Sequence, residues 1–285
     1  MNVSITLSGI TVHLKEDHNF HWLFRVGRVF CVFDQQDSGN ICFGVEAQDG
    51  KQFIKYAGAK PTEFEGDPRD AVQRLKEAVD VYEDLVHEHL IALRSHFAVD
   101  GGGYALVYEW FNGECLHPHW SYPPPAKYTD SRSPYYRFRQ LSIKLRLEAL
   151  DHIYSFHKYT EAKRYVAIDF YDGSILYNFD THTTKICDID FYQRQPCTNT
   201  NGWGSPRYIA PEELDPTTQL DERTNVFRMG AIAFGLLGGE LDRSRSKWEG
   251  GEELYRIALK AVDDNPMQRY ASVREFTNEW NQYTT

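Results

Sequence analysis

The sequence predicts an α+β protein with a small antiparallel β-rich N-terminal part, which carries one helix, and a larger, mainly helical C-terminal part. Runs of β-forming residues separated by turn signals dominate up to residue 111, whereas apolar residues at helical spacing recur after residue 140. Of the 285 residues, 41% are hydrophobic and 25% are charged, close to the average of globular proteins. This composition excludes a disordered or fibrous chain.

Three antiparallel strands are predicted between residues 21 and 56, after an N-terminal extension over residues 1–20. The segment is rich in Phe, Val, Ile and Cys and is interrupted by DSGN at 37–40 and by QDG at 48–50. Gly, Asn and Asp favour tight turns, whereas β-branched and aromatic residues favour strands. The run YALVYEWF, residues 104–111, predicts a further strand, and the boundary between the two parts is expected where it ends.

Two long amphipathic helices are predicted from apolar residues that recur at three- and four-residue spacing. One follows Pro68, and the other covers Leu141–Tyr159. The apolar stripe of the first contains Val72, Leu75, Val79 and Tyr82, and that of the second contains Ile143, Leu147, Leu150 and Tyr154.

Residues 122–134, which include three consecutive prolines, predict a loop insertion because proline removes backbone donors. Short β segments on both sides of Asn178–Thr181 predict a hairpin, and the chain from Leu214 onward is expected to be mainly helical. The basic stretch Arg132–Arg146 is expected to be a solvated helix start in preference to a docking patch.

Charge and cysteine content limit the partners and the compartment. A formal net charge of −10 disfavours binding to nucleic acid or to an anionic membrane. Five widely spaced cysteines without a C-x-x-C pair indicate neither a disulfide framework nor a zinc site. The N-terminus lacks a signal-peptide pattern, and Val226–Leu237 is too short to span a bilayer. A cytoplasmic location is therefore expected.

Three segments in the C-terminal part resemble, in order, conserved regions of protein kinases. Residues 204–213, GSPRYIAPEE, resemble the end of an activation segment. Residues 221–239, DERTNVFRMGAIAFGLLGG, resemble the central helix of the large lobe. Residues 263–270, DDNPMQRY, resemble the arginine-bearing segment that closes this lobe. The chain thus resembles a divergent protein kinase of the bacterial Ser/Thr type. The resemblance implies one bilobal kinase-like domain with an N-lobe over 21–110 and a C-lobe over 111–285.

The same resemblance implies a buried ion pair between Glu212 and Arg269 that anchors the activation segment. Asn225 stands where the family usually has Asp, and an amide can still accept backbone hydrogen bonds. AIDFYDGSI, residues 167–175, stands where the catalytic loop His-Arg-Asp-x-x-x-x-Asn belongs, and DFY, residues 190–192, where Asp-Phe-Gly belongs. Asp169 is therefore expected to orient the substrate hydroxyl and Asp190 to hold the metal.

The assignment of the acids has alternatives. Asp172 and Asp188 are close competitors, and Asp188 lies two residues before Asp190 on the same side of an extended strand, so a shared or swapped metal role stays open. Without the downstream motifs, both acids could be ordinary turn or strand-end carboxylates.

Several positions depart from the family pattern and imply a slow enzyme. Ser174 replaces the metal-binding Asn, which would weaken metal affinity because hard cations prefer the amide oxygen. Tyr171 replaces the Lys that contacts the γ-phosphate, which removes a charge contact from the transition state. Tyr192 replaces the motif's Gly, and Ile168 replaces the Arg before the catalytic Asp.

In the N-terminal part, Lys55 in QFIKY resembles the phosphate-binding Lys of kinases, with Glu77 as the candidate partner on the first helix. An exposed lysine on an edge strand is the alternative for Lys55. DQQDSGNI, residues 34–41, matches the glycine-rich loop only at Gly39 and Ile41, and a plain hairpin turn explains it equally well.

In the strand 104–111, the kinase-like register places Tyr108 beside the adenine pocket and directs the Glu109 carbonyl and the Phe111 amide to the adenine edge. A core strand would use the same residues.

The resemblance implies a kinase that uses ATP with Mg²⁺ or Mn²⁺ and transfers phosphate to Ser or Thr of an unidentified protein. A pseudokinase that binds nucleotide or serves as a scaffold is the first alternative. A small-molecule phosphotransferase is the second, although the Ala-Pro-Glu segment at 210–212 argues against it. Neither nucleic acid nor a membrane is an expected partner.

Overall fold

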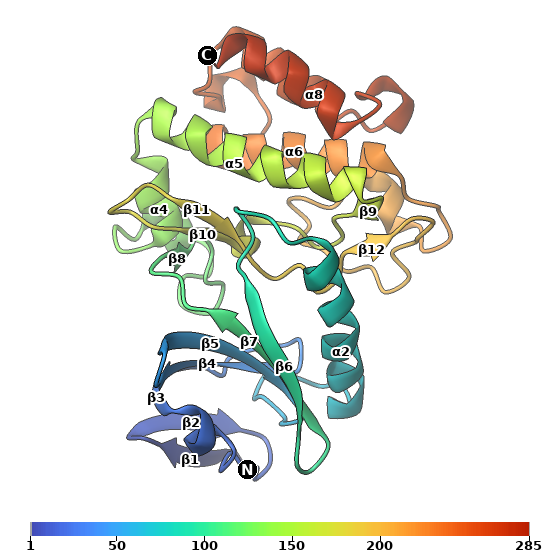
Figure 1. The fold of residues 1–285 in the computed structure, drawn as a ribbon. Coiled ribbons are helices and arrows are strands. Elements are labelled where there is room, and N and C mark those ends of the chain that lie inside the picture. The colour runs from blue at the N-terminus through green and yellow to red at the C-terminus, as the bar shows by residue number, and fades with distance from the viewer. Residues whose placement is uncertain (1, 285) are drawn as a thin grey trace. The chain divides into compact units, whose positions relative to one another are not determined.

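The computed structural model describes residues 2–284, which form two compact units (Figure 1). The first unit contains the chain up to Val86 together with Ile91–Phe111. The second contains His87–Leu90 and the chain from Asn112 onward. The molecule is a mixed α+β protein, as predicted.

The first unit is built on a five-stranded antiparallel sheet with the strand order β3-β4-β5-β7-β6. These strands are β3 (Arg28–Phe33), β4 (Asn40–Ala47), β5 (Gly50–Ala57), β6 (Leu93–Val99) and β7 (Gly103–Glu109). The predicted turns at 37–40 and 48–50 join β3, β4 and β5, and the predicted strand over YALVYEWF is β7. Residues just after His21 form the short helix α1 (Leu23–Val26) and not a strand.

Two features of the first unit were not predicted. The expected N-terminal extension contains a hairpin of β1 (Val3–Leu7) and β2 (Ile10–Leu14), which packs Leu7, Val12 and Leu14 into the core of the unit. Strand β6 forms an edge of the sheet, and its alternation of apolar and polar residues is weak.

The helix predicted after Pro68 is α2 (Pro68–Asp84). It begins there because the Asp67 side chain accepts a hydrogen bond from the Arg69 amide at 2.8 Å and because proline at the first helical position has no donor to lose. Its apolar stripe is buried against β5 and β7. Tyr82 of this helix meets Tyr108 of β7 edge to face, with ring centroids 5.0 Å apart.

The second unit is mainly helical, as expected. Its helices are α3 (Ala126–Thr129), α4 (Pro134–Arg139), α5 (Ile143–Ala162), α6 (Glu222–Leu237), α7 (Glu252–Ala261) and α8 (Val273–Trp280). Short 3₁₀ turns cover η1 (Asp172–Ser174), η2 (Pro211–Leu214), η3 (Arg245–Lys247), η4 (Pro266–Gln268) and η5 (Asn281–Tyr283). Helix α6 is the most deeply buried and contacts α5, α7 and α8. The long helix predicted at Leu141–Tyr159 is α5.

Two small sheets in the second unit position its loops. Strands β8 (Glu114–Cys115), β10 (Ile175–Tyr177) and β11 (Thr184–Ile186) pair in the order β11-β10-β8, and β9 (Tyr165–Val166) pairs with β12 (Gln193–Arg194). The hairpin predicted around Asn178–Thr181 is confirmed. It joins β10 to β11, and the Asn178 side chain accepts hydrogen bonds from the amides of Asp180 and Thr181.

The expectation of a solvated helix start over Arg132–Arg146 is wrong at its C-terminal end. Arg146 is 2% exposed, donates to the Leu236 carbonyl at 3.2 Å and pairs with Glu249, which also pairs with Arg139. The Glu249 carboxylate thus pairs with one arginine of α4 and one of α5. The local charge pattern could not indicate this pairing, because Glu249 is distant in sequence.

Between residues 2 and 284, no helix combines the length and the apolar composition needed to cross a bilayer. The buried helix α6 has 16 residues.

Candidate active site

The predicted ion pair between Glu212 and Arg269 is confirmed. Arg269 is 5% exposed and binds Glu212 with both ends of its guanidinium group, at 2.7 Å to Oε1 and 2.8 Å to Oε2. Burial alone would raise the pKa of Glu212, but the contacts with Arg269 lower it below its ordinary value. This bidentate pair ties the end of the segment 204–213 to the chain that follows α7.

Asn225 accepts the backbone hydrogen bond expected of its amide and also donates one. Its Oδ1 accepts from the Ala167 amide at 2.8 Å, and its Nδ2 donates to the Tyr165 carbonyl at 2.8 Å. Beside it, the fully buried pair Arg228–Glu213 was not predicted. Helix α6 therefore holds the backbone of the strand that leads to Asp169 through the side chain of Asn225.

The turn η1, which carries the predicted metal ligand Ser174, lies at the start of the β10–β11 hairpin. Ile175 pairs with Ile186 in the hairpin, and the Cys187 amide donates to the Ser174 carbonyl at 2.9 Å. The residue that follows Cys187 is Asp188. Strand register thus places Asp188 close to Ser174, whereas Asp190 lies further along, inside a turn closed by the bond from the Tyr192 amide to the Ile189 carbonyl.

Asp169 and Asp188 both adopt left-handed backbone conformations, with φ values of 62° and 55°. Such conformations are uncommon outside glycine and concentrate at functional sites, where the surrounding structure maintains them. Both aspartates also influence the pKa of Tyr171. Burial raises the pKa of this phenol well above its ordinary value, and the negative charges of Asp188 and Asp169 raise it further. The two acids therefore lie in one neighbourhood around Tyr171.

Tyr171 occupies the position where the resemblance predicts a lysine in active kinases, and its ring lies over Gly173. A Cβ atom at Gly173 would lie 2.3 Å from the ring, so any larger residue at this position would have to displace Tyr171. The neutral ring fills the position without providing a cation.

Ser174 is buried, and its hydroxyl has no hydrogen-bond partner within residues 2–284. An unpaired buried hydroxyl is costly, which makes it a candidate ligand. No group of three His, Cys, Asp or Glu residues in the same range could hold a metal ion. The side chains present fit Mg²⁺ nonetheless, because Mg²⁺ is usually bound by one or two carboxylates, with phosphates and water completing its shell. Ser174 with Asp188 or Asp190 could hold it in this way.

Tyr192 anchors the segment that follows Asp190. Its hydroxyl donates to Nε2 of His157 at 2.8 Å, while Nδ1 of His157 donates to the Ile153 carbonyl at 2.8 Å. Burial lowers the pKa of His157 to about 3, so the imidazole stays neutral and can accept this bond. The side chain that replaces the motif's glycine thus attaches the segment to α5.

In the first unit, Lys55 lies on β5 opposite Cys42 and Leu106 and is 9% exposed. Strand β5 is central in the sheet, so the alternative of an exposed edge-strand lysine is wrong. The expected pairing of Lys55 with Glu77 is also wrong. Glu77 lies on the solvent-facing side of α2, where it accepts from Gln73 at 2.8 Å.

The loop between β3 and β4 contains Gly39, with φ 85°, and a Cβ atom there would lie 2.8 Å from both Ala71 and Phe64. Glycine is therefore required by packing against α2. Ile41 is fully buried in the core of the unit. At the end of β7, Glu109 pairs with Gln52 and its carboxylate binds Arg94, and Phe111 is the last residue of the unit.

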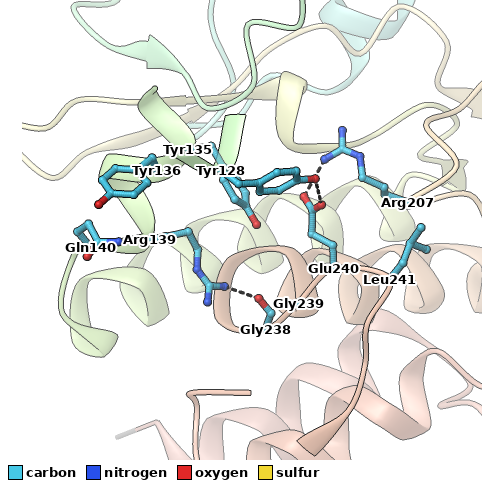
Figure 2. Close-up of a pocket in the computed structure, with 10 residues that line it drawn as sticks. All are labelled: Tyr128, Tyr135, Tyr136, Arg139, Gln140, Arg207, Gly238, Gly239, Glu240 and Leu241. Carbon is cyan, nitrogen blue, oxygen red and sulfur yellow. Dashed lines mark hydrogen bonds and ion pairs between the residues drawn. The ribbon is translucent and has the colours of Figure 1, made fainter. Parts of the chain in front are cut away.

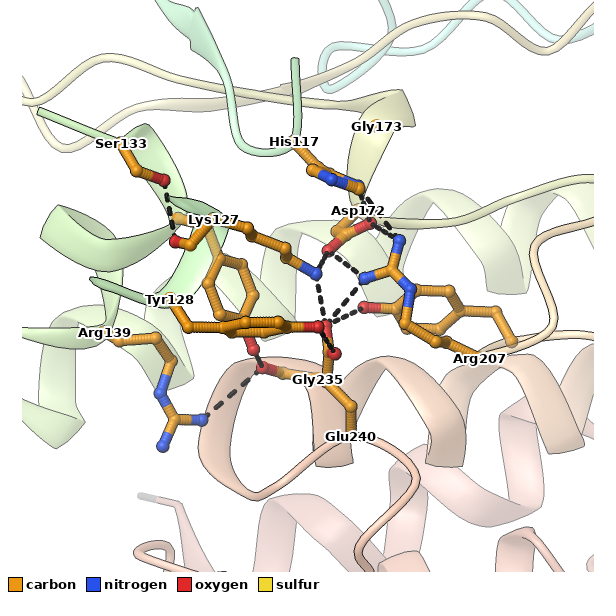
Figure 3. A network of polar contacts seen from close by, with 12 residues as sticks. His117, Lys127, Tyr128, Ser133, Arg139, Asp172, Gly173, Arg207, Gly235 and Glu240 are labelled. Carbon is orange, nitrogen blue, oxygen red and sulfur yellow. Dashed lines mark hydrogen bonds and ion pairs between the residues drawn. The ribbon is translucent and has the colours of Figure 1, made fainter. Parts of the chain in front are cut away.

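A buried polar cluster of the second unit was not predicted from the sequence (Figure 3). The Asp172 carboxylate accepts from Lys127 at 2.6 Å and from Arg207 at 2.9 and 3.1 Å. Lys127 and Arg207 also bind Glu240, the latter at 2.7 Å. Lys127 and Asp172 are completely buried, and Glu240 is 7% exposed. We call Lys127, Asp172, Arg207 and Glu240 the four-charge cluster.

The surrounding cations keep the Asp172 carboxylate of the four-charge cluster ionised. Burial alone would raise the pKa of Asp172, but His117, Lys127 and Arg207 bring it well below its ordinary value. The Lys127 ammonium also lies 4.0 Å from the centre of the Tyr135 ring, a cation–π contact. Because Asp172 belongs to the same turn as Ser174, the cluster holds this turn to the segment around Arg207.

No model of a protein family and no curated protein sequence matches this chain. The resemblance to protein kinases is therefore carried by the sequence motifs alone.

Replacing Asn225 with Asp, the residue usual in kinases, is expected to destabilise this protein by about 1–3 kcal/mol. The Ala167 amide and the Tyr165 carbonyl require one acceptor and one donor, which an ionised carboxylate cannot provide together. Urea unfolding at neutral pH measures the change. The exposed substitution Asn278→Asp on α8 is the control, and equal stability of both variants would contradict the hydrogen-bond assignment.

Proposed function

We propose that this protein transfers the γ-phosphate of ATP, with Mg²⁺ or Mn²⁺, to Ser or Thr hydroxyls of a protein, at a slow rate. The observation that carries the proposal is the placement of Asp169 and Asp188. Both acids have left-handed backbones, and the charges of both raise the pKa of Tyr171. Asp188 directly follows Cys187, whose amide donates to the carbonyl of Ser174.

Phosphoryl transfer needs a carboxylate at the attacking hydroxyl and another that holds the metal. The first role is assigned to Asp169, which orients the hydroxyl and takes its proton. Asp188 is assigned to hold the metal together with Ser174, and Asp190 is the alternative to Asp188 in this role. Bound Mg-ATP would supply the phosphoryl group and the charge neutralisation. The resemblance assigns nucleotide contacts to Lys55, Gly39, Glu109 and Phe111. It also assigns one to Ile41, but this side chain is fully buried in the core of the first unit and cannot make it.

Tyr171 explains the expected slow rate. In active kinases the resemblance places a lysine there, which contributes positive charge as the transition state forms. The phenol of Tyr171 stays neutral because its pKa is raised, so that contribution is lost.

A pseudokinase is the second candidate. Tyr171 occupies the phosphate-contacting position and Ser174 the metal-contacting position, and each is a weaker ligand than the Lys or Asn usual in kinases. It would bind nucleotide without turnover. A small-molecule phosphotransferase is less favoured, since the Glu212–Arg269 pair supports the activation-segment end that such enzymes often lack. For either kinase-like function, we propose a cytoplasmic location.

The test is transfer of labelled phosphate from ATP to the protein itself or to a generic basic protein, with Mg²⁺ or Mn²⁺. Asp169→Asn is expected to lower the rate by about 10²-fold or more. Asn tolerates the left-handed backbone of this position, so the loss reports the carboxylate and not strain. Asp151→Asn, at an exposed position on α5, is the matched control and should keep the rate.

Label transfer that persists in Asp169→Asn would remove the enzyme proposal. Thermal stabilisation by Mg-ATP without any transfer would instead favour the pseudokinase, because a ligand that binds only the native state raises its melting temperature.

A further inference from the structure

The Pro-rich insertion, residues 122–134, places one side chain in the four-charge cluster. Helix α3 lies within this insertion and carries Lys127, whose ammonium group binds Asp172 at 2.6 Å and also binds Glu240. Lys127 is completely buried, and its ammonium group lies 4.0 Å from the ring centre of Tyr135. A buried lysine with two carboxylate partners and an aromatic face has little freedom to move. The insertion is therefore fixed to the turn η1, which begins at Asp172.

Both carboxylate oxygens of Asp172 are bound. Oδ2 accepts from Lys127 at 2.6 Å and from Nη1 of Arg207 at 2.9 Å. Oδ1 accepts from Nη2 of Arg207 at 3.1 Å and lies 3.4 Å from Nδ1 of His117. A metal ion would have to displace buried, charge-assisted bonds to reach this carboxylate, which disfavours Asp172 as a metal ligand. Its contacts instead attach the turn to two other segments of the chain.

The turn η1 depends on such attachments because a single 3₁₀ turn has few hydrogen bonds of its own, with poor geometry. Within it, the Ser174 amide donates to the Tyr171 carbonyl at 3.0 Å. The Gly173 carbonyl accepts from the Cys115 thiol at 3.2 Å, but a thiol is a weak donor. The far end of the turn is bonded to the β10–β11 hairpin through the Ser174 carbonyl. At the near end, the charge-assisted bonds of Asp172 provide the attachment, two residues before the buried hydroxyl of Ser174.

Arg207 is the member of the cluster that can be altered with least damage to the fold. Arg207 and Glu240 lie in the wall of a pocket of about 460 Å³ (Figure 2). The side chain of Arg207 is 16% exposed, whereas Lys127 and Asp172 are completely buried. Water in the pocket can therefore solvate a shorter side chain at position 207. Lys127 still neutralises the two carboxylates in part when Arg207 is replaced.

We propose that Lys127 and Arg207 are positioning residues for the metal site. Through Asp172 they hold η1 so that the Ser174 hydroxyl is placed to bind Mg²⁺ or Mn²⁺. The Pro-rich insertion thereby contributes to the metal site from a distance. Partners that orient metal ligands commonly change metal affinity by about tenfold or more. The inference rests on the metal ligation assigned to Ser174 in the proposed function and does not require phosphate transfer.

The experiment is calorimetric titration of the intact protein with a non-hydrolysable ATP analogue, once with Mn²⁺ and once with a chelator. The factor by which Mn²⁺ tightens binding of the analogue is the metal enhancement. Arg207→Met should reduce the metal enhancement about threefold to tenfold, and Arg207→Lys should reduce it less because lysine keeps one charge. Ser174→Ala gives the reduction expected when the hydroxyl is lost completely.

Phe276→Leu on α8 is the control for a general loss of stability. Phe276 is completely buried and packs against Tyr154 and Trp280, and it belongs to neither the turn nor the four-charge cluster. Its substitution should lower stability and leave the metal enhancement unchanged. Urea unfolding curves of all variants establish that they are folded and rank their stability.

Equal metal enhancement in the wild-type protein and in both Arg207 variants would overturn the inference. An equal reduction in Phe276→Leu would do the same, because the effect would then follow stability alone. No enhancement in the wild-type protein, or none lost in Ser174→Ala, would remove the inference together with the metal assignment of Ser174. A graded loss in the Arg207 variants without any phosphate transfer would support the inference and remove the transfer proposal.

Discussion

Replacing Lys127 with Met is expected to lower the free energy of unfolding by about 3–5 kcal/mol. The substitution nearly preserves the side-chain length but leaves Asp172 and Glu240, both buried, with Arg207 as their remaining cation. Two carboxylates that share one guanidinium group in a low-dielectric site repel each other, and neither can be rehydrated without opening the structure. Chemical denaturation at neutral pH measures the loss.

Lys144→Met is the matched control, because Lys144 is 85% exposed and lies 4.0 Å from Glu148 on the surface of α5. Its effect should stay within about 0.5 kcal/mol. A Lys127→Met protein as stable as the Lys144→Met protein would show that the four-charge cluster does not contribute to stability.

Replacing Asp188 with Asn is expected to reduce phosphate transfer by about 10²-fold or more, whereas Asp190→Asn should have a clearly smaller effect. The hairpin register puts Asp188 close to Ser174, and the charge of Asp188 raises the pKa of Tyr171. Asp190 lies in the following turn. Asn retains an oxygen ligand and the left-handed backbone but loses the negative charge that binds a hard cation.

Residual activity of Asp188→Asn should require more Mg²⁺ or Mn²⁺ for half-maximal rate, because the lost charge weakens metal binding. Transfer assays over a range of metal concentrations measure this shift. If Asp190→Asn loses the activity and Asp188→Asn retains it, the metal role belongs to Asp190, as the kinase motif predicts.

Local patterns predicted several of the longer regular elements. Helix α2 follows from one apolar stripe and an Asp-Pro start, and strands β3, β4 and β5 follow from β-forming runs between turn residues. The pair Glu212–Arg269 was also predicted, because both partners lie in recognisable motifs. Strand β6 and the N-terminal hairpin were not, since their burial depends on neighbours distant in sequence.

Pairings between side chains were less predictable. Counting along a helix placed Glu77 opposite Lys55. In the structure Glu77 is exposed and does not lie on the face of α2 that packs against the sheet. A shift of one position rotates a helical side chain by about 100°, so a small alignment error moves it from one face to another.

The sequence by itself determined the α+β class, the order of several longer elements and the presence of kinase-like motifs, because these depend on periodicity and on short segments. Only the tertiary structure decided that Cys187, the residue before Asp188, is bonded to Ser174, that Lys127 of the Pro-rich insertion is a buried ion-pair partner, and that Arg207 joins Asp172 to Glu240. These contacts join residues from separate segments of the chain. Their free energy comes from burial and from mutual geometry, which no local pattern specifies.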